Sequence, residues 1–363
     1  MTLRVLLATP YDMAVPGGVN TQVFGLYRAL LRRGVDVRLV GPSSSEAAEP
    51  DPRITALGHP LALPFNGATS RVTADVRVLP ALRRLAHAFD PDVVHVQEPV
   101  APIPCAALLW LAPARALRVG TFHTYSETSR GYLLAWPWAR MVWSRLHVRV
   151  AVSEAARAYA AEFHPLPFEI IPNAIELPEA VPTPPPGSGP CRVLFVGRLD
   201  EARKGFGPLL GAVRAVEAEA PGTLSLLAIG RGAHLWREAA AGVPVTFAGE
   251  VVEGDLWQAI GDAEIVAVPS LGGESFGLVP LEAMAYHRPV IASQIEGYAG
   301  WMGDAARMVP PGDEAALARA LKDLATDPAR RAELTARGAR LARQFSWEVA
   351  VDRWIALYAR RAR

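Results

Sequence analysis

A proline-rich segment near the middle of the chain constrains the fold more than any other feature. From Pro178 to Pro190 the residues read Pro-Glu-Ala-Val-Pro-Thr-Pro-Pro-Pro-Gly-Ser-Gly-Pro. Such a segment is extended and cannot join a sheet, so it predicts a semi-rigid linker at 178–190. A chain of 363 residues is also too long for one hydrophobic core. We therefore expect two domains, at residues 1–177 and 191–345.

Both parts of the chain alternate short apolar runs with helical patterns. The runs are rich in Val and Ile and lack strict alternation, which predicts parallel strands covered by helices on both faces. The predicted strands span 5–8, 35–40, 93–96, 118–122, 148–152 and 170–171 in the first part, and 192–196, 224–229, 245–248, 265–268 and 290–292 in the second. A last helix, at about 346–363, is assigned to the first domain. The pattern predicts two doubly wound α/β domains, whose ligands bind beyond the carboxyl ends of the strands.

Composition argues against several classes of function. The formal charge is only +1 and no basic stripe dominates, so nucleic acid is not an expected partner. Cys105 and Cys191 are far apart in the sequence, which fits a reducing cytoplasm better than a disulfide scaffold. The apolar run before Pro10 is too short for a signal peptide. The longest apolar stretch, at 100–117, is interrupted by prolines and Arg115, so no membrane span is expected.

Three familiar binding patterns are incomplete, absent or misplaced in this sequence. Gly230-Arg231-Gly232 follows a strand, but position 235 is leucine where the dinucleotide fingerprint needs a third glycine. The chain has no Gly-Lys pair, so no phosphate-binding P-loop is present. Asp90-Pro91-Asp92 precedes a strand and predicts a turn at the wrong end of the sheet for a metal site. We therefore expect no metal and no cofactor.

The strongest pattern in the second half runs from Glu274 to Glu282, with the sequence Glu-Ser-Phe-Gly-Leu-Val-Pro-Leu-Glu. It follows the strand ending near Val268 and opens a helix, whose free backbone N–H groups can hold a phosphate. Glu274 can reach a sugar hydroxyl, and Glu282 can accept hydrogen bonds from ribose hydroxyls. Taken alone, however, a pair of glutamates is more often a pair of capping or solvated carboxylates.

A second pattern, Gly197-Arg198-Leu199-Asp200-Glu201-Ala202-Arg203-Lys204-Gly205, follows the first strand of the same domain. Arg198 offers a planar fork and Lys204 a point charge, and both suit a diphosphate. The plainer interpretation makes Arg203 and Lys204 solvated loop charges. A nucleoside-diphosphate leaving group, however, needs its developing charge neutralised, and a pair of cations can do this without a metal.

Together these two segments resemble the signature of the family 4 retaining glycosyltransferases with the GT-B fold. The residues at 200–205 and 271–277 are similar to the phosphatidylinositol mannosyltransferase branch of that family. The resemblance covers nearly the whole chain, and in the first half it includes Pro16-Gly17-Gly18-Val19, Pro64-Phe65-Asn66-Gly67, His95-Val96-Gln97-Glu98-Pro99, Phe122-His123-Thr124 and Ala151-Val152-Ser153-Glu154. It implies two facing Rossmann-like domains with a cleft between them and a hexose transfer that retains anomeric configuration.

The resemblance also implies roles for individual residues. Those implied for catalysis are His123, which faces the transferred sugar, and Arg198, Lys204 and Glu274. Those implied for the donor are Gly17, Gly18, Gly230, Arg231, Val251, Ser275, Phe276, Gly277, Leu278 and Glu282. Those implied for the acceptor are Tyr11, Asn20, Asn66, Arg71 and Thr124. No residue stands out as a covalent nucleophile.

The acceptor side departs from the mannosyltransferase pattern. The relatives carry a lysine where Thr128 stands, and Glu127 adds a negative charge beside it. The stretch at 77–87 matches the basic helix that docks those enzymes on anionic membranes, but it has only three arginines and contains Pro80. Each basic residue near such a surface contributes about 1 kcal/mol, so this anchor is weak alone. The aromatic and arginine residues at 132–145 are typical either of a membrane interface or of core packing.

These observations predict an enzyme that moves a hexose, mannose from GDP-mannose first among the choices, to a lipid-linked or cyclitol-type acceptor. The expected location is the cytoplasm, on the inner face of the plasma membrane if the chain docks there. Two alternatives stay open. One is a transferase that uses a UDP- or GDP-sugar on a soluble sugar or natural product. The other is a non-catalytic nucleotide-sugar-binding protein.

Overall fold

The computed structural model describes residues 2–45, 51–65, 68–101, 103–125, 136–163, 165–182 and 189–360, with the backbone alone at 63–65 and 68–70. The chain forms two compact units. The first comprises Met1–Glu176 together with Ser346–Arg363, and the second comprises Leu177–Phe345.

A parallel sheet organises the first unit. Its strands lie in the order β3-β2-β1-β6-β7-β8-β9, and every neighbouring pair is parallel. Their bounds are β1 (Arg4–Ala8), β2 (Asp36–Gly41), β3 (Ile54–Ala56), β6 (Val93–Gln97), β7 (Leu117–Phe122), β8 (Val148–Ala151) and β9 (Glu169–Ile170). A separate antiparallel hairpin consists of β4 (Leu61–Phe65) and β5 (Ala68–Val72).

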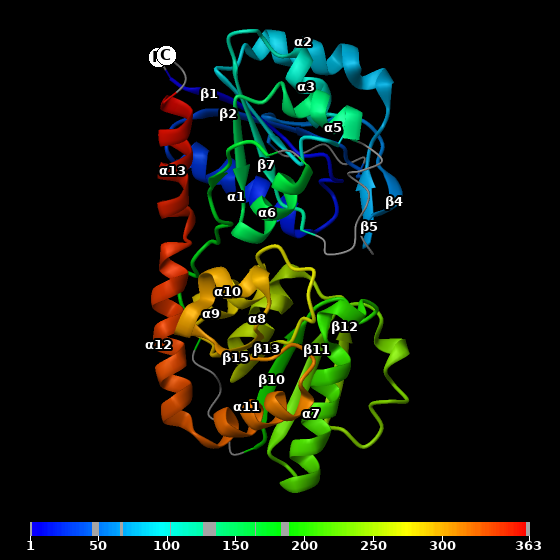
Figure 1. The fold of residues 1–363 in the computed structure, drawn as a ribbon, viewed down its shortest axis with the longest axis vertical. Helices are drawn as coiled ribbons and strands as arrows, with labels where there is room; N and C mark the ends of the chain where they lie inside the picture. The colour runs from blue at the N-terminus through cyan, green and yellow to red at the C-terminus, as the bar shows by residue number, and fades with distance from the viewer. Residues whose placement is uncertain are drawn as a thin grey trace. The chain divides into compact units, whose positions relative to one another are not determined.

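Helices cover both faces of this sheet, as the residues of β1 show. Val5 and Leu7 point into a core shared with α1 (Gly18–Arg32) and α13 (Trp347–Ala359). Leu6 and Ala8 point into a second core on the opposite face, because successive side chains of a strand alternate. The helices of that second core are α2 (Leu79–Phe89), α3 (Cys105–Leu111), α5 (Trp136–Trp143) and α6 (Glu154–Phe163), and the short η1 (Val76–Val78) precedes α2. Figure 1 shows α13, in red, beside α1, in blue.

The second unit repeats the architecture with a sheet in the order β12-β11-β10-β13-β14-β15, again parallel throughout. The strands are β10 (Cys191–Val196), β11 (Leu224–Ile229), β12 (Val245–Gly249), β13 (Ile265–Val268), β14 (Val290–Ser293) and β15 (Arg307–Val309). The helices are η2 (Ala202–Lys204), α7 (Phe206–Glu219), η3 (Ala233–Leu235), α8 (Glu253–Asp262), α9 (Leu278–Ala285), α10 (Glu296–Met302), η4 (Gly303–Ala305), α11 (Glu314–Thr326) and α12 (Pro328–Gln344). Residues of α7 and α11 fill one core with the strands.

The predicted fold class is confirmed, because both units are parallel sheets layered with helices. Each strand predicted from the sequence is present, with ends that differ by at most one residue. The sequence did not reveal β3, β15 or the β4–β5 hairpin, which are short or lie apart from the two main sheets. Part of the proline-rich linker, at 183–188, lies outside the described residues.

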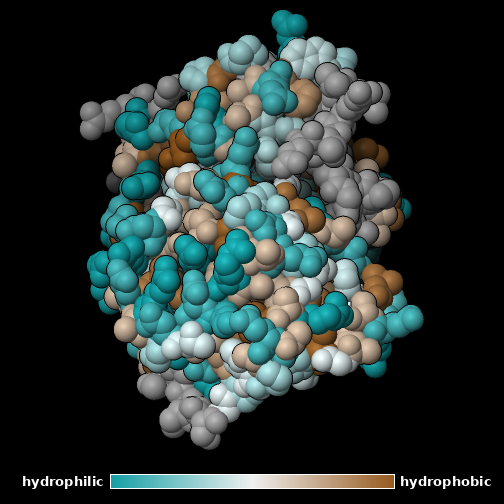
Figure 2. Space-filling model, turned by 60° about the horizontal axis from the view of Figure 1, so that its bottom comes forward, coloured by the Kyte–Doolittle hydropathy of each residue, from teal (hydrophilic) through white to brown (hydrophobic). Residues whose placement is uncertain are grey.

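The surface and the aromatic residues bear on the question of membranes. No helix among the described residues is both long and apolar enough to cross a bilayer. Of the aromatic stretch on α5, Trp143 is buried in the core and so cannot face a membrane, whereas Trp136 is 36% exposed. Figure 2 shows one face of the molecule, where hydrophilic residues predominate and hydrophobic ones are scattered.

Candidate functional site

A cluster of charged side chains lies at the carboxyl ends of β10 and β13 in the second unit. Arg198, Arg203 and Lys204 come from the loop that follows β10, and Glu274 comes from the loop between β13 and α9. Neighbouring parallel strands end at the same edge of a sheet, which is where such sheets bind ligands. The fold thus places both halves of the predicted donor signature together. We call Arg198, Glu201, Arg203, Lys204 and Glu274 the cation cluster.

Ion pairs join all five members of the cation cluster. Glu274 Oε1 lies 2.6 Å from Lys204 Nζ and 3.0 Å from Arg203 Nη1. Glu201, which is buried, lies 2.7 Å from Arg198 and 2.8 Å from Arg203. Three cations face two carboxylates, so the cluster keeps one net positive charge. The lysine and Arg203 are therefore not the freely solvated loop charges of the plainer interpretation, because both are mostly buried by their partners.

Close backbone approaches hold the loops of the cation cluster against one another. Gly205 has φ of 75°, and a Cβ there would lie 1.9 Å from the carbonyl oxygen of Pro269, which follows β13. Gly230 has φ of 138°, and a Cβ there would lie 1.9 Å from the carbonyl oxygen of Gly197. Only glycine fits such positions. The loops after β10, β11 and β13 therefore pack without side chains between them, and Arg231 adds an ion pair with Asp200 at 3.0 Å.

The rest of the predicted donor segment lies just before α9 and in its first turns. Ser275 and Gly277 precede this helix, Leu278 is its first residue, and Glu282 lies one turn further along. Burial, and secondly the charge of Glu253, raise the pKa of Glu282 to about 7. The predicted Val251 lies between β12 and α8. The predicted residues thus line the carboxyl edge of β10 to β13.

Phe276 has a different position from its neighbours in the donor segment. Its ring is buried and stacks on Trp301 at 4.9 Å between ring centroids, with Phe345 at 5.7 Å. Aromatic packing of this kind stabilises the core. The predicted donor contact of Phe276 therefore concerns its backbone alone.

In the first unit, His123 lies directly after β7 and is held by residues at the end of β6. Its Nε2 is 2.7 Å from Gln97 Oε1, and its backbone N–H donates to Glu98 Oε1 over 2.8 Å. The hydroxyl of Thr124 donates to the same oxygen over 2.9 Å. All of these side chains except Thr124 are buried. Burial lowers the pKa of His123 to about 3 and raises that of Glu98, so the imidazole is neutral at pH 7.

The residues predicted for the acceptor have different environments in the structure. The amide of Asn20 donates to the carbonyl oxygens of Asp12 and Val15 and accepts from Thr9, so both of its N–H groups hold the loop after β1. Arg71 on β5 has an exposed guanidinium that lies 3.8 Å from the buried carboxylate of Asp12. Tyr11 pairs through its backbone with Val72 beside it. The predicted Asn66 lies outside the described residues, as do Glu127 and Thr128.

Packing does not require the glycine at position 17, at the start of α1. Gly17 is the N-cap of that helix and Gly18 its first residue, and both are exposed. The φ of Gly17 is −176°, which any residue adopts, and a Cβ there would meet no heavy atom within 4 Å. The fold itself therefore leaves room for a larger side chain at position 17.

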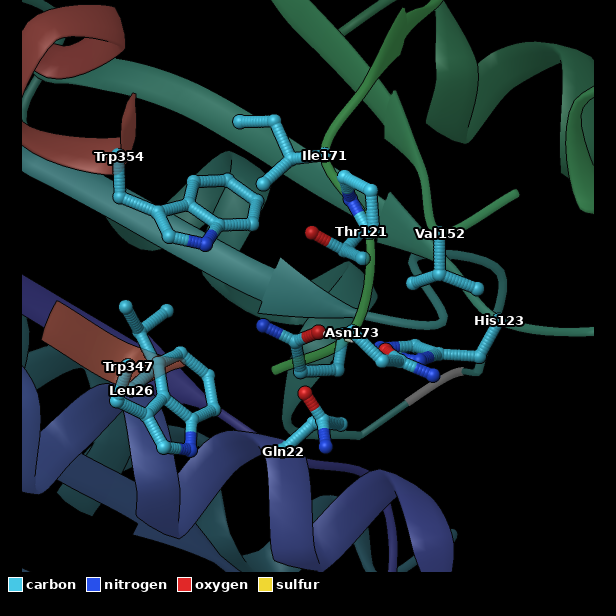
Figure 3. Close-up of a pocket in the computed structure, with 11 residues that line it drawn as sticks. Gln22, Leu26, Thr121, His123, Val152, Ile171, Asn173, Trp347 and Trp354 are labelled. Carbon is cyan, nitrogen blue, oxygen red and sulfur yellow. Dashed lines mark hydrogen bonds between the residues drawn. The ribbon is translucent and has the colours of Figure 1, made fainter. Parts of the chain in front are cut away.

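A small cavity in the first unit borders His123. Figure 3 shows its lining, which comes from α1, α13 and the strand ends: Gln22, Leu26, Gln97, Thr121, His123, Val152, Ile171, Pro172, Asn173, Trp347 and Trp354. Its volume of about 20 Å³ has room for a water molecule but not for a hexose. This pocket lies beneath His123 and by itself encloses too little space for a hexose.

Sequence reasoning did not assign Gln97, Glu98, Glu201 or Arg203 to the site. A signal existed for the first two, because they end the β6 strand and the carboxyl ends of parallel strands carry function. The other two lie within three residues of Lys204. Among the described residues no three His, Cys, Asp or Glu side chains form a candidate metal site.

Comparisons with known proteins match each unit to a glycosyltransferase family model. Residues 16–179 match the family model "Glycosyltransferase Family 4", and residues 190–327 match "Glycosyl transferases group 1". The phosphatidyl-myo-inositol mannosyltransferase of Mycobacterium leprae is 33% identical, over 98% of this chain and 96% of the relative. The D-inositol 3-phosphate glycosyltransferase of Kineococcus radiotolerans is 27% identical, over 95% of this chain and 90% of the relative.

A solved structure supports the same fold. The sucrose-phosphate synthase of Thermosynechococcus elongatus superposes on this chain with a TM-score of 0.74, at 22% sequence identity. The match covers 99% of this chain and 99% of the synthase chain. Its likeness extends over both parallel sheets and their helices. From these matches and the two Rossmann-like units, the chain belongs to the family 4 glycosyltransferases with the GT-B fold.

Proposed function

We propose that this glycosyltransferase moves mannose from GDP-mannose to a lipid-linked, inositol-type acceptor, with retention of anomeric configuration and without a metal. The names of the relatives support the sugar and the acceptor class, since those from Mycobacterium leprae and Mycolicibacterium smegmatis are phosphatidyl-myo-inositol mannosyltransferases. The resemblance to family 4 supports retention.

The cation cluster is the observation that supports binding of a nucleotide-sugar donor. Its net positive charge lies at the ligand-binding edge of a parallel sheet, and Arg198 and Lys204 each contact a carboxylate that a diphosphate can replace. Preorganised cations of this kind stabilise charge that develops on a leaving group. They supply the neutralisation that other transferases obtain from a metal, which is the basis for proposing a metal-independent reaction.

The proposed reaction exchanges one C–O bond for another. The bond between the anomeric carbon and the β-phosphate oxygen breaks, and GDP leaves with the bonding electron pair. An acceptor hydroxyl forms the new bond on the same face of the sugar, and its proton passes to the departing phosphate oxygen. Arg198 and Lys204 stabilise the growing phosphate charge, and Glu274 orients the sugar through its hydroxyls.

Two exposed surfaces support a lipid acceptor. Helix α2 and the turn before it expose Arg77, Arg83 and Arg84, while α5 exposes Trp136 and Met141. Basic residues attract an anionic leaflet at about 1 kcal/mol each, and aromatic residues favour the membrane interface. We therefore propose docking on the inner face of the plasma membrane from the cytoplasm.

A soluble cyclitol phosphate is the second candidate acceptor. The observation that favours it is the likeness to the D-inositol 3-phosphate glycosyltransferase of Kineococcus radiotolerans, which covers 95% of this chain. A phosphate on the acceptor would suit the exposed guanidinium of Arg71. This candidate needs no membrane.

The donor is tested by the melting temperature of the protein with GDP-mannose, UDP-glucose, UDP-N-acetylglucosamine and ADP-glucose at equal concentrations. A ligand at 100 times its Kd stabilises the folded state by about 2.7 kcal/mol. We expect GDP-mannose to raise the melting temperature most. A larger rise with a UDP- or ADP-sugar would overturn the choice of donor.

The acceptor is tested by transfer of radiolabelled mannose in three mixtures: phosphatidylinositol in anionic vesicles, the same vesicles without it, and free inositol phosphate. We expect labelled lipid from the first mixture only, and equal rates with EDTA or Mg²⁺. Label on free inositol phosphate alone would support the second candidate. Stabilisation by the donor without transfer to any acceptor would favour a non-catalytic binding protein.

A further inference from the structure

A row of buried polar side chains connects His123 to the C-terminal helix. Gln97 Oε1 lies 2.7 Å from His123 Nε2, and Gln97 Nε2 lies 3.2 Å from His95 Nε2. His95 Nδ1 lies 2.8 Å from the hydroxyl of Tyr358 on α13. His95 and Tyr358 are fully buried, and Gln97 is 3% exposed. We call Tyr358, His95, Gln97 and His123 the polar row.

The amide of Gln97, with Oε1 toward His123 and Nε2 toward His95, sets the direction of the hydrogen bonds along the polar row. An amide oxygen only accepts, so Nε2 of His123 carries the proton and donates to Gln97. An amide nitrogen only donates, so Nε2 of His95 accepts from Gln97. The proton of His95 is then on Nδ1, which donates to Tyr358. Each imidazole is thereby held in one tautomer.

Packing keeps the polar row in place from both sides. The hydroxyl of Thr121 on β7 lies 2.6 Å from His95 Nε2, and the ring of Trp354 lies 4.7 Å from the His95 ring. A buried hydrogen-bonded network of this kind is rigid, and losing one member leaves others unpaired in a medium that penalises them. The orientation of Gln97 is therefore fixed by residues of β6, β7 and α13.

The other ring nitrogen of His123 is Nδ1. Among the residues that the structure describes, Nδ1 of His123 has no hydrogen-bond partner. In the tautomer set by Gln97 this nitrogen bears a lone pair and no proton, so it can accept a hydrogen bond but cannot donate one.

We propose that Gln97, supported by His95 and Tyr358, is a positioning residue that fixes His123 as its Nε2–H tautomer, so that Nδ1 accepts a hydrogen bond from a hydroxyl of the transferred sugar. This inference rests on the proposed function, in which His123 faces that sugar. It makes His123 an acceptor that selects a hydroxylated sugar and not a general acid. It also gives α13 a part in the reaction, through Tyr358.

The tautomer is measured directly by ¹⁵N NMR of the full chain labelled at histidine. The two tautomers have distinct ¹⁵N shift patterns, and His123→Gln identifies the signals of His123. We expect the Nε2–H pattern for His123 in the unmodified protein and the Nδ1–H pattern for His95. An Nδ1–H pattern for His123 would overturn the proposal, because Nδ1 would then be a donor.

Gln97→Leu and Gln97→Glu test what the tautomer does. Gln97→Leu removes the acceptor, so we expect mixed tautomers at His123 and a fall in kcat of about 10- to 100-fold, as when the partner that orients a metal-bound histidine is removed. The KM for GDP-mannose should change little. Gln97→Glu keeps an acceptor for the Nε2–H group, so we expect it to retain the tautomer and recover most of kcat above pH 7.

The pH profile of Gln97→Glu gives a further readout. The titratable groups around His123 are His95 on β6, Glu98 after β6 and, beyond them, Tyr358 on α13. A carboxylate at position 97 favours imidazolium at His123 or His95, so kcat should gain an acidic limb that the unmodified protein lacks. An unchanged profile together with an unchanged tautomer in Gln97→Leu would refute a positioning role.

Gln22→Leu is the matched control for structural damage. Gln22 lines the same cavity, and its amide pairs with the backbone of Ala174 at 2.8 Å in both directions without touching His123. We expect Gln22→Leu to lower the melting temperature but to leave the His123 tautomer unchanged. If the unmodified protein transferred no mannose, the proposed function would fail, yet the NMR patterns would still decide whether the polar row sets the tautomer.

Discussion

At the scale of single residues, desolvation changes the acidity of Glu282 at the carboxyl edge of the second sheet. Glu282 has a pKa of about 7, chiefly because it is buried and secondly because Glu253 is near. Ribose hydroxyls donate hydrogen bonds, and an ionised carboxylate accepts two of them. Donor binding should therefore favour the ionised form of this side chain.

We expect the Kd for GDP-mannose to weaken as the pH falls below 7, by up to about tenfold per pH unit. Glu282→Gln should bind more weakly at pH 8 and lose this dependence. Calorimetric titration from pH 5.5 to 8.5 measures both. The nucleotide-sugar is the better probe, because the terminal phosphate of free GDP itself titrates near 6. A slope that persists in Glu282→Gln would assign the titration to another group.

The same pKa has a consequence for stability that has the opposite sign. A carboxyl group whose pKa is raised by folding favours the folded state at low pH, and this contribution is lost as the pH rises through about 7. Without ligand, Glu282→Gln should therefore melt at a higher temperature than the unmodified protein at pH 8. The difference should shrink toward pH 4.5.

Gly17 offers a test that separates the fold from the ligand. Serine is a preferred N-cap, and a side chain at this position meets nothing within 4 Å. Gly17→Ser should therefore leave the melting temperature equal or higher. The KM for GDP-mannose should rise about tenfold or more, because the backbone can no longer approach the phosphates. Gly300→Ser, which is equally unobstructed, should leave the KM unchanged.

The residue scale is also where sequence reasoning was weakest. Arg198, Lys204 and Glu274 could be chosen because their loop positions matched a donor signature. Gln97 was not chosen although it ends a strand, because its partner His123 is 26 residues away and only the fold brings the two together. Glu201 was not chosen because its pairing with Arg198, three residues earlier, depends on the local conformation of the loop. The burial of Phe276 was equally hidden, since it depends on Trp301 and Phe345.

At the scale of elements, the strands were predictable and the helix contacts were not. Val- and Ile-rich runs such as 224–229 define buried parallel strands, because these runs are covered on both faces. The β4–β5 hairpin was missed although its sequence carries Asn66-Gly67, a dipeptide typical of tight hairpin turns. The last helix was assigned to the first domain from the sequence, but the contact of α13 with α1 required the structure.

That contact is close enough to test. A Cβ at Gly25 on α1 would lie 2.4 Å from the indole of Trp347 on α13, and both residues are buried. Gly25→Ala should therefore lower the free energy of unfolding by about 1–3 kcal/mol through overpacking, despite the better helix propensity of alanine. Urea unfolding followed by circular dichroism measures this.

Gly300→Ala on α10 is the control for the Gly25 variant. An alanine there meets no heavy atom within 4 Å, so its helix propensity should stabilise the protein by up to about 1 kcal/mol. If Gly25→Ala proved as stable as this control, the close packing of α1 on α13 would be wrong.

At the scale of the whole molecule, the chain has almost no net charge, and its function depends on where charges gather. The formal charge is +1, yet three cations and two carboxylates meet at one sheet edge, and three arginines lie exposed on and before α2. Composition could argue against a nucleic-acid partner, but it could not reveal either cluster. The fold creates both by bringing strand ends and helix faces together.

We propose that the cation cluster binds the diphosphate of GDP-mannose during the transfer of mannose. The chain has two lysines, Lys204 in the cluster and Lys322, which forms an ion pair with Glu219 on the surface. The decisive measurement is kcat/KM for mannose transfer from GDP-mannose in Lys204→Met and Lys322→Met. We predict a loss of about 100- to 1000-fold for Lys204→Met and none for Lys322→Met. Equal activity in the two variants would contradict the claim.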